Sequence, residues 1–548
     1  MKRLKHPKFF SFAMLGVVAV ALAGCSQQSS SNTPRNKTVA VSSKDVISTM
    51  DSSLNTDQIG SQNLNNTMEG LYRYRGKQLK PAMATSIAQP TNNGTVYNIN
   101  LRHAKWSNGD PVTAHDFVYA WRRIVDPKTG SQYSYIYSGI KNADAIVAGK
   151  KKPDTLGIKA LGDHQLQITL EHPIPYFNTL VTGSQFLPIN QRSIKKAGNT
   201  YGISSKEMAF NGPYKLVNWK VGDTEWTEVK NHSYWNAHHV QPKAIKYYTI
   251  KDPNTGLNLY DTNQMDRYQD ISGDSARQLS NRHDFGTDLT SSTFYIEMNQ
   301  KKLPYFKNAK LRQAISLTIN RDELSNNVLG KTGTASHSIV PRDMTHHKTT
   351  GTDFVKEPSA LADQQYTSYN PKKATKLWQE GLQETGQKEL NLTMTTDDTD
   401  TAKKQAEYLQ NSFEKNLPGL KVTISSVPFK TRIQRQSTHD FDLIVAAWNA
   451  DYPDPTNFMD LFTTGNPQND GQWSNKEYDH YVKAAETTDI NNPELRWKDM
   501  LQAQHIITKE QGVIPLYQVT SASLTKSNVH NFKITPTGLY DMASVIKN

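Results

Sequence analysis

The sequence predicts an α/β fold, and its C-terminal half carries the clearest pattern. Residues 390–394 and 420–424 alternate apolar and polar side chains, as half-buried strands do. Between them, the apolar residues of 402–413 recur at helical spacing. The uninterrupted apolar run 443–447 is typical of an inner strand that is buried on both faces. Strands that alternate with helices in this way define the α/β class.

The N-terminus has the pattern of a secretory signal. Lysine or arginine occupies positions 2, 3, 5 and 8, and the apolar stretch 9–23 is short for a bilayer span. The stretch ends in Leu-Ala-Gly-Cys, which resembles the lipobox at which bacterial lipoproteins are cleaved and lipid-modified. We therefore expect residues 1–24 to be a signal peptide and Cys25, the only cysteine, to be the lipid-modified N-terminus. The polar residues 25–37 then form a flexible tether.

Further elements follow in order along the chain. Residues 97–101 alternate as a strand, and the segment 108–111 turns the chain. Thr113 and Asp116 form a capping-box pattern at the start of a helix. Residues 311–319 predict another amphipathic helix, and Asn370 before a proline opens a third.

The charge of the chain excludes one class of partner. The formal net charge is +12, but the basic residues are scattered among apolar ones and form no arm or stripe. We interpret this charge as a solvated surface that faces an anionic membrane or wall, and we expect no nucleic-acid binding.

The segment WNADYPDP, residues 448–455, follows the predicted inner strand. In open α/β sheets ligands bind at the carboxyl ends of strands, and prolines stiffen the loop there. Asp451 is a candidate ligand-binding carboxylate, although capping the turn is the plainer role for an aspartate beside prolines. Asp454, between two prolines, is expected to serve the turn.

Enzymatic and metal-binding patterns are weak. LGKTG at 329–333 resembles a phosphate loop, but Ser325 stands where the first glycine is required. The adjacent histidine pairs 238–239 and 346–347 lack a third ligand nearby. No second acid is singled out for a glycosidase pair, and no nucleophile–base pattern stands out. We expect no enzyme, no cofactor and no metal site.

Several segments resemble, in order, the family 5 extracellular solute-binding proteins, the peptide-binding components of ABC importers. The strongest is LRHAKWSNGDPVTAHDFVYAWRRIVDP at 101–127. The others are 64–74, 81–88, 210–219, 229–237, 307–324, 369–378 and 441–455. The subgroup that the chain resembles most is the oligopeptide-binding proteins.

This resemblance implies a two-lobed, periplasmic-binding-protein-like fold with an additional inserted domain. Lobe I would combine residues 38–70, 206–289 and 518–548. The inserted domain would take 71–205, and lobe II would take 290–517. The two lobes would close on a ligand by a hinge motion.

The resemblance also implies a function and a site. The chain would be a monomeric, lipid-anchored receptor on the cell membrane, facing the extracellular side, or the periplasm in a cell with an outer membrane. It would bind oligopeptides and deliver them to a permease with ATPase subunits. Asp451 matches the family aspartate that holds the peptide ammonium. The backbone of Trp448, Asn449 and Ala450 would pair with the peptide main chain. Trp448 would wall a side-chain pocket, and Tyr133 aligns with a family tyrosine that contacts the peptide.

Two alternatives keep the same fold. The receptor could be dedicated to one peptide signal, which would also need Asp451. It could instead bind a non-peptide ligand, such as a metal chelate or a sugar, and a neutral sugar offers no ammonium to this carboxylate. The disulfide that some family members carry near the site is impossible here, because Cys25 is the only cysteine.

Overall fold

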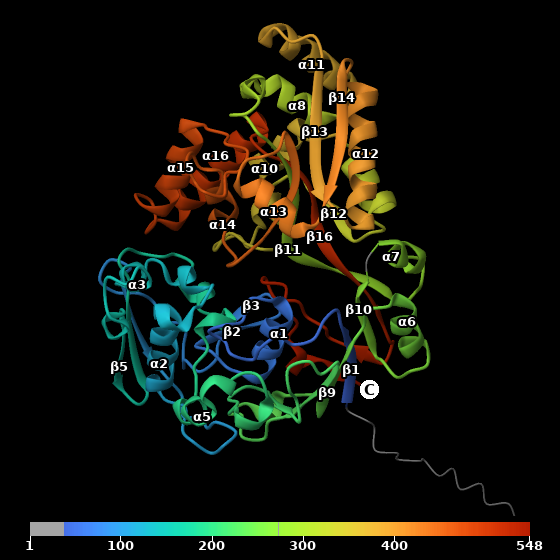
Figure 1. The fold of residues 1–548 in the computed structure, drawn as a ribbon. Coiled ribbons are helices and arrows are strands. Elements are labelled where there is room, and N and C mark those ends of the chain that lie inside the picture. The colour runs from blue at the N-terminus through green and yellow to red at the C-terminus, as the bar shows by residue number, and fades with distance from the viewer. Residues whose placement is uncertain (1–37, 272) are drawn as a thin grey trace, which may run out of the picture. The chain divides into compact units, whose positions relative to one another are not determined.

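A mixed 11-stranded sheet runs through the structure, in the order β14-β13-β15-β11-β16-β10-β1-β9-β8-β7, with β12 paired to β16 (Figure 1). The structure is a computed structural model that describes residues 38–271 and 273–548. The strands are β1 (Thr38–Ser43), β7 (Tyr214–Val217), β8 (Glu225–Lys230), β9 (Ala244–Thr249), β10 (Arg267–Ile271), β11 (Phe285–Met298), β12 (Gly333–Ala335), β13 (Leu390–Asp397), β14 (Leu420–Val427), β15 (Leu443–Asn449) and β16 (Ile514–Thr525). The predicted α/β class is confirmed.

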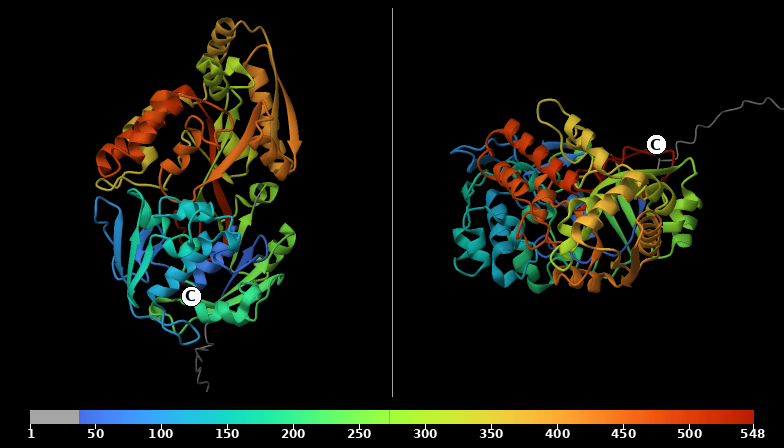
Figure 2. Two further views of the ribbon diagram at one scale, coloured as in Figure 1. Left: turned by 60° about the vertical axis from the view of Figure 1, so that its left-hand side comes forward. Right: turned by 90° about the horizontal axis from the view of Figure 1, so that it is seen from above.

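Three smaller sheets and a set of helices surround this sheet. The small sheets are β4 (Val96–Asn100) with β6 (Gln165–Thr169) and β5 (Ile158–Gly162), β2 (Tyr72–Arg75) with β3 (Gln78–Pro81), and β17 (Val529–His530) with β18 (Ile546–Lys547). The α-helices are α1 (Gln58–Thr67), α2 (Ala114–Val125), α3 (Ala143–Val147), α4 (Phe177–Leu180), α5 (Gln191–Ala197), α6 (Pro253–Asp261), α7 (Gly273–Leu279), α8 (Ala309–Leu317), α9 (Arg321–Glu323), α10 (Pro358–Ala362), α11 (Pro371–Thr385), α12 (Asp400–Asn416), α13 (Phe429–Ser437), α14 (Thr456–Met459), α15 (Lys476–Glu486) and α16 (Pro493–Glu510). Helix α12 packs along β13 and β14 (Figures 1 and 2).

The helix starts predicted from capping residues are confirmed. The Thr113 backbone N–H donates to Asp116 Oδ2 over 2.8 Å at the start of α2. The Asn370 side chain accepts from the Lys373 N–H at the start of α11, where a proline occupies the first turn. Helix α8, predicted over 311–319, ends at Leu317.

The inner strand is confirmed, but it is longer than predicted. β15 lies between β13 and β11, as the apolar run indicated. It continues through Trp448 and Asn449, because these residues pair with Thr293 and Ser292 of β11. Trp448 and Asn449 are therefore the last strand residues, and the loop begins one position before Asp451.

The long strands β11 and β16 connect separate buried clusters. One cluster gathers residues from 39–247 and 529–545, and two others lie within 295–517. Leu516 of β16 belongs to one of the latter clusters, whereas Leu524 of the same strand belongs to a fourth cluster with Tyr260 and Tyr268. The predicted boundaries near residues 70, 205, 290 and 517 stay predictions.

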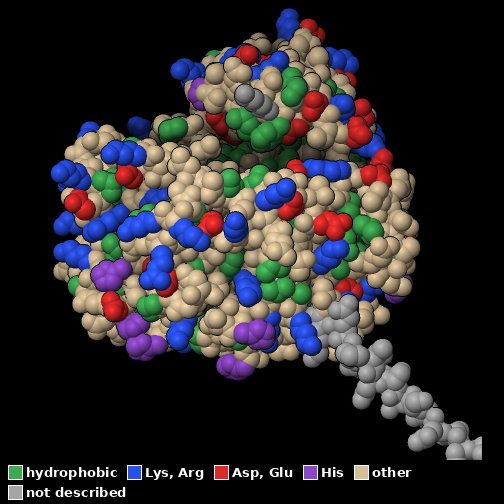
Figure 3. Space-filling view, turned by 60° about the horizontal axis from the view of Figure 1, so that its bottom comes forward, with side chains coloured by type: hydrophobic (Ala, Val, Ile, Leu, Met, Phe, Trp, Pro, Cys, Tyr) green, Lys and Arg blue, Asp and Glu red, His purple; other side chains and the backbone are tan. Residues whose placement is uncertain are grey.

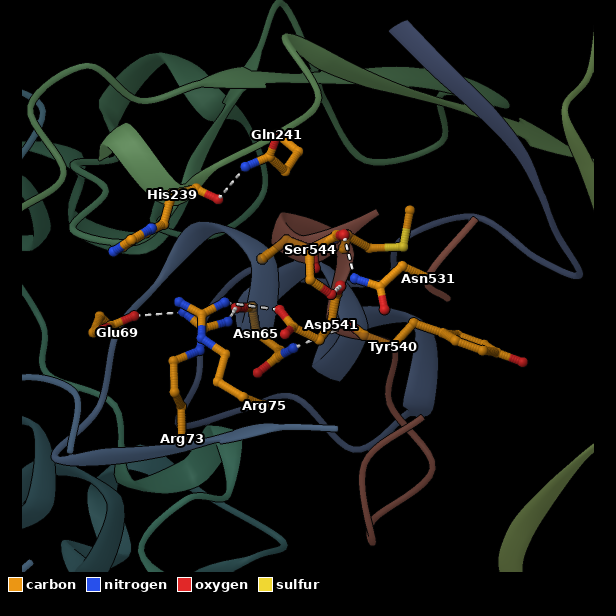
Figure 4. A network of polar contacts seen from close by, with 12 residues as sticks. Asn65, Glu69, Arg73, Arg75, His239, Gln241, Asn531, Tyr540, Asp541 and Ser544 are labelled. Atoms are coloured by element: carbon orange, nitrogen blue, oxygen red, sulfur yellow. Dashed lines mark hydrogen bonds and ion pairs between the residues drawn. The ribbon is translucent and has the colours of Figure 1, made fainter. Parts of the chain in front are cut away.

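A buried polar network joins β2 to the C-terminal segment (Figure 4). The Glu69 carboxylate, on a residue only 1% exposed, accepts hydrogen bonds from Arg73 Nη1 and from the Tyr234 hydroxyl. Arg75 Nη1 donates to Asp541 Oδ1 over 2.9 Å. Because 466 positions separate these last two residues in the chain, the contact fixes the C-terminal segment against the N-terminal part.

The surface charge is dispersed. Figure 3 shows lysine and arginine side chains spread over one face, with aspartate and glutamate side chains among them. In the part of the chain that the structure describes, no helix is both long enough and apolar enough to cross a membrane.

The network predicts a large stability loss when its buried arginine is removed. We expect Arg73→Met to lower the free energy of unfolding by about 3 to 5 kcal/mol, because the variant removes one partner of a buried ion pair with Glu69. Urea unfolding measures this loss. The matched control is Arg192→Met, which breaks an exposed pair with Asp110 and is expected to lose less than about 1 kcal/mol. Equal losses in the two variants would contradict a structural role for the network.

Candidate functional site

A cavity of about 990 Å³ lies at the carboxyl end of β15. Its walls come from three parts of the chain that are distant in sequence. They are residues 135–138 (Tyr135, Ile136, Ser138), residues 172–180 (His172, Pro173, Ile174, Pro175, Tyr176, Leu180) and residues 448–496 (Trp448, Asp451, Tyr452, Asn457, Asp460, Leu461, Asn466, Gln468, Glu486, Thr487, Ile490, Arg496). A cavity of this size and mixed polarity is suited to an organic ligand.

Asp451 lies in this cavity, two residues after β15 ends. Its backbone N–H donates to Asn457 Oδ1 over 3.1 Å, and the same oxygen accepts from Trp448 Nε1 over 3.1 Å. Asn457 is buried on α14, so one amide side chain fixes both the loop and the indole.

The Asp451 carboxylate has hydrogen-bond donors but no cation. The Asn457 side chain and the Tyr135 hydroxyl hydrogen-bond to it. No lysine, arginine or histidine among the described residues forms an ion pair with it. Burial raises the pKa of Asp451 to about 6, and the two hydrogen bonds only partly offset that rise. A half-buried carboxylate of this kind is suited to an incoming cation.

The tyrosine that hydrogen-bonds to Asp451 is Tyr135, whereas the role of Tyr133 as a peptide contact stays a prediction. Tyr133 lines a second cavity of about 780 Å³, and its ring centre lies 5.6 Å from that of Tyr135. Burial, followed by the charge of Asp451, raises the pKa of both tyrosines. Tyr137 is buried, and its hydroxyl donates to the Gln185 carbonyl. Tyr135 and Tyr137 lie in a 3-10 turn that Tyr133 directly precedes. The spacing of the three tyrosines in the sequence does not show which of them points toward Asp451.

The outer edge of β15 has no strand partner at Asn449 within the described residues. Ala450 N–H donates to the Ser291 carbonyl over 2.9 Å, so this donor is engaged with the chain itself. Backbone groups alternate in direction along an antiparallel strand, so those of Asn449 point away from β11. On that outer edge, within the described residues, β15 pairs with β13 only at Leu443 and Ile444.

The side chains of Trp448, Asn449 and Ala450 lie in three different environments. Trp448 is half-buried in the wall of the first cavity, and Asn449 is exposed and lines the second. Ala450 is buried in an apolar cluster. Consecutive residues at the end of β15 therefore line different cavities, Trp448 the first and Asn449 the second.

Asp454 has the predicted turn role and also a buried ion pair. Its Oδ1 accepts from the Thr456 N–H and hydroxyl, at 3.1 and 2.7 Å. Arg496 Nη1 and Nη2 donate to its two oxygens over 2.9 and 2.7 Å. Burial alone would raise the pKa of Asp454, but the Arg496 guanidinium holds it below the usual value. Nothing in the sequence around Asp454 pointed to Arg496.

A tyrosine pair forms another wall. The rings of Tyr176 and Tyr452 stack with centres 4.1 Å apart and planes at 6°. Tyr176 precedes α4 and Tyr452 follows Asp451, so the stack joins segments almost 300 positions apart in the chain. Sequence reasoning missed Tyr135, Tyr176 and Arg496, because each contributes through contacts between distant segments. It also missed Asn457, whose contacts with Trp448 and Asp451 depend on how the loop folds back.

The weak metal and phosphate patterns find no support in this geometry. Within residues 38–271 and 273–548, no group of three or more histidine, cysteine, aspartate or glutamate residues could hold a metal ion. The LGKTG segment leads from a π-helical turn into β12 instead of following a strand. Cys25 lies outside the described residues.

Comparison with known proteins establishes the family. The model of the bacterial extracellular solute-binding proteins, family 5, matches residues 78–470, and the chain belongs to this family. A dipeptide-binding protein of Lactococcus lactis subsp. cremoris is 33% identical, with 97% of each chain covered. The protein is therefore an extracellular solute-binding protein and not an enzyme, as the resemblance predicted.

Solved structures are similar over nearly the whole chain. The structure of Listeria monocytogenes OppA bound to peptide has a TM-score of 0.72 at 38% identity, covering 94% of this chain and 99% of that one. The structure of the pheromone receptor PrgZ has a TM-score of 0.73 at 34% identity, covering 94% and 100%. These likenesses confirm the predicted periplasmic-binding-protein-like α/β fold.

Proposed function

We propose that the protein is a lipid-anchored receptor that binds oligopeptides and delivers them to an ABC transporter for import. One observation carries this proposal: the half-buried Asp451 carboxylate faces a cavity of about 990 Å³ without a cation of its own. Peptides outside the cell supply the missing charge through their α-ammonium group. Names of relatives support the ligand class, since they include a dipeptide-binding protein and an OppA bound to peptide.

The chemistry of the anchor follows from its neighbours. An ammonium in the cavity would donate charge-assisted hydrogen bonds to Asp451, whose other contacts to Tyr135 and Asn457 hold the carboxylate in one orientation. The outward backbone groups of Asn449 would pair with the peptide main chain, as an added strand does. The indole of Trp448 would pack against a peptide side chain. This arrangement recognises what all peptides share and leaves the side chains variable.

Charge and space favour a peptide longer than two residues. A bound dipeptide places its carboxylate close to its ammonium, and that carboxylate needs a nearby cation. Arg496, the only arginine or lysine that lines the first cavity in the described chain, already donates to Asp454 and to the Ala485 carbonyl. The second cavity of about 780 Å³ is lined by Lys44 and by Asn449, the residue that follows Trp448 of the first cavity. A longer peptide would extend into it past Asn449 and Tyr133.

Capture and release would use the two lobes proposed from the sequence, with boundaries near residues 70, 205, 290 and 517. Strands β10, β11 and β16 carry register shifts between Gln269 and Ile271 and between Leu289 and Thr293. Irregular positions of this kind interrupt the ladder where strands pass between buried clusters. Rotation at these positions would close the cavities over a ligand.

The likeness to PrgZ, a pheromone receptor, favours one second candidate. The chain would then serve a single peptide signal, with the same anchor at Asp451. Competition between a mixed peptide library and individual peptides separates the two functions, because a general importer binds most members of the library. A metal chelate or a sugar would leave Asp451 without the ammonium that its position suits.

Replacing the anchor should abolish most of the affinity. We expect Asp451→Asn to weaken binding of free-amine peptides by about 2 to 5 kcal/mol, because the ammonium is then buried without a counter-charge. Calorimetric titration of residues 26–548, freed of co-purified ligand, with a short-peptide library measures the loss. N-acetylated peptides should bind the unaltered protein poorly, and Asp440→Asn, at an exposed position, should bind normally. Equal binding of acetylated and free peptides would remove Asp451 as the anchor.

The affinity should also depend on pH through Asp451. Its pKa of about 6 in the empty site means that the carboxylate is charged at pH 7 and mostly protonated at pH 5. The peptide α-amino group, with a pKa of about 8, stays charged at both values. We therefore expect binding about tenfold weaker at pH 5 than at pH 7, measured by the same titration. The Asp451→Asn variant should show a smaller change, and an identical change in both would assign it to another group.

The lipid anchor has its own test. We expect Cys25→Ser to release the protein from membranes into the soluble fraction, because the lipid-bearing residue is lost. Fractionation with and without detergent, followed by immunoblotting, measures the distribution. The control is Ser26→Ala beside it. A variant that still needs detergent for extraction would argue against lipidation at Cys25.

A further inference from the structure

The first cavity contains more carboxyl groups than a peptide ammonium requires. Besides Asp451, the carboxylates of Asp460 and Glu486 line it. They come from separate elements: Asp460 follows α14, and Glu486 is the last residue of α15. Both side chains are half-buried, and neither forms an ion pair with any described residue.

The arginine in the same wall does not neutralise them. Arg496 donates through both terminal nitrogens to Asp454 and through Nε to the Ala485 carbonyl over 3.0 Å. Its charge is therefore matched by Asp454, which is itself buried. Asp451, Asp460 and Glu486 share no further arginine or lysine in the cavity wall, as far as the structure describes the chain.

Glu486 occupies a position that disfavours a carboxylate in the absence of a ligand. The carboxyl end of a helix carries a partial negative charge, and Glu486 ends the 11-residue helix α15. Burial, followed by the charges of Asp460 and Asp454, raises the pKa of Glu486 to about 8. Burial raises the pKa of Asp460 as well. An added cation would offset the burial of these carboxylates, their mutual repulsion and the negative end of the helix.

The remaining walls fit an aliphatic stem. Apolar side chains and the tyrosine stack also line this cavity; they are Ile174, Leu180, Leu461, Ile490, Tyr176 and Tyr452. Lysine and arginine carry three or four methylene groups beneath their charge, which pack on apolar surface while the head reaches a polar group. An aspartate or glutamate side chain would meet like charges, and a purely apolar one would leave the carboxylates without a partner.

We propose that this cavity is a specificity subsite for the cationic side chain of a lysine or arginine near the N-terminus of the bound peptide, with Glu486 and Asp460 as its counter-charges. The inference rests on the proposed peptide-binding function and adds a preference to it. The ammonium at Asp451 sets the register, and one of the first three side chains then enters the cavity.

The test compares pentapeptide pools that differ at one position. Position 1, 2 or 3 is held as lysine in one pool and as uncharged norleucine in its partner, with a free α-amine in both. Calorimetric titration is expected to show binding about 10-fold to 100-fold tighter for the lysine pool at one of these positions. Glutamate at the same position is expected to bind more weakly than norleucine.

Variants assign the preference to named residues. Glu486→Gln and Asp460→Asn should each reduce the lysine-to-norleucine affinity ratio, by about tenfold for Glu486→Gln. Glu477→Gln is the matched control, since it removes an exposed carboxylate from the first turn of the same helix and should keep the ratio. An unchanged ratio in both subsite variants would overturn the assignment of these residues.

Proton release gives a second readout that a purely structural role would not produce. The charged and titratable groups around Glu486 are Asp454, Asp460, Arg496, Tyr176 and Tyr478. With its pKa near 8, the Glu486 carboxyl holds a proton at pH 7 in the empty cavity and should lose it when a cation arrives. Binding heats of the lysine pool should therefore vary with the ionisation enthalpy of the buffer, and those of the norleucine pool should vary less.

The outcomes separate the subsite from the general function. If free-amine pools bind with equal affinity whether lysine or norleucine is held, the subsite is wrong and peptide binding stands. If no free-amine pool binds, the proposed peptide-binding function is itself wrong, and the subsite that rests on it is wrong as well. If acetylated and free pools bind alike but lysine is still preferred, the cavity recognises cations and Asp451 is not the anchor.

Discussion

The buried ion pair between Asp454 and Arg496 fixes the loop on which the site depends. Asp454 also accepts from Thr456, and these contacts together set the start of α14. The next residue of that helix is Asn457, whose amide oxygen holds both the Asp451 backbone and the Trp448 indole. The anchor carboxylate is therefore positioned by a chain of contacts that begins at an arginine on α16. Prolines alone would restrict the backbone of this loop, but they would not orient the Asp451 carboxylate.

The same ion pair makes the cavity acidic. Each nitrogen of the Arg496 guanidinium donates to Asp454 or to a carbonyl, and Arg496 forms no ion pair with the other carboxylates of the wall among the described residues. Removing carboxylates from water without a cation is unfavourable, and the raised pKa values of Asp451 and Glu486 express that cost. A cationic ligand offsets this cost of burying the carboxylates. Part of the binding free energy therefore comes from an unfavourable charge arrangement that folding creates. The site is rigid because its polar groups hold one another in place, which limits the ordering needed on binding.

Local patterns predicted the elements well and their ends less well. The capping box at Thr113 and the cap at Asn370 act within one helical turn, so they appear in the sequence as they do in the structure. The inner strand was recognised from its apolar run, but its last residues, Trp448 and Asn449, are strand only because β11 lies beside them. Pairing with a distant strand leaves no pattern in the local sequence, and a polar residue such as Asn449 after an apolar run predicts a loop.

The candidate site also contains some residues that the sequence singled out and others that only the tertiary structure identified. Family segments and the strand-end position singled out Asp451 and Trp448, because a binding loop after an inner strand is a property of neighbouring residues. That Tyr135 lies beside Asp451 was not predicted, because it depends on the orientation of a 3-10 turn more than 300 positions away in the chain. Asn457, Arg496 and Glu486 acquire their roles only when α14, α15 and α16 meet around one cavity. Sequence patterns report which residues are near along the chain, whereas burial, pairing and charge compensation depend on which residues are near in space.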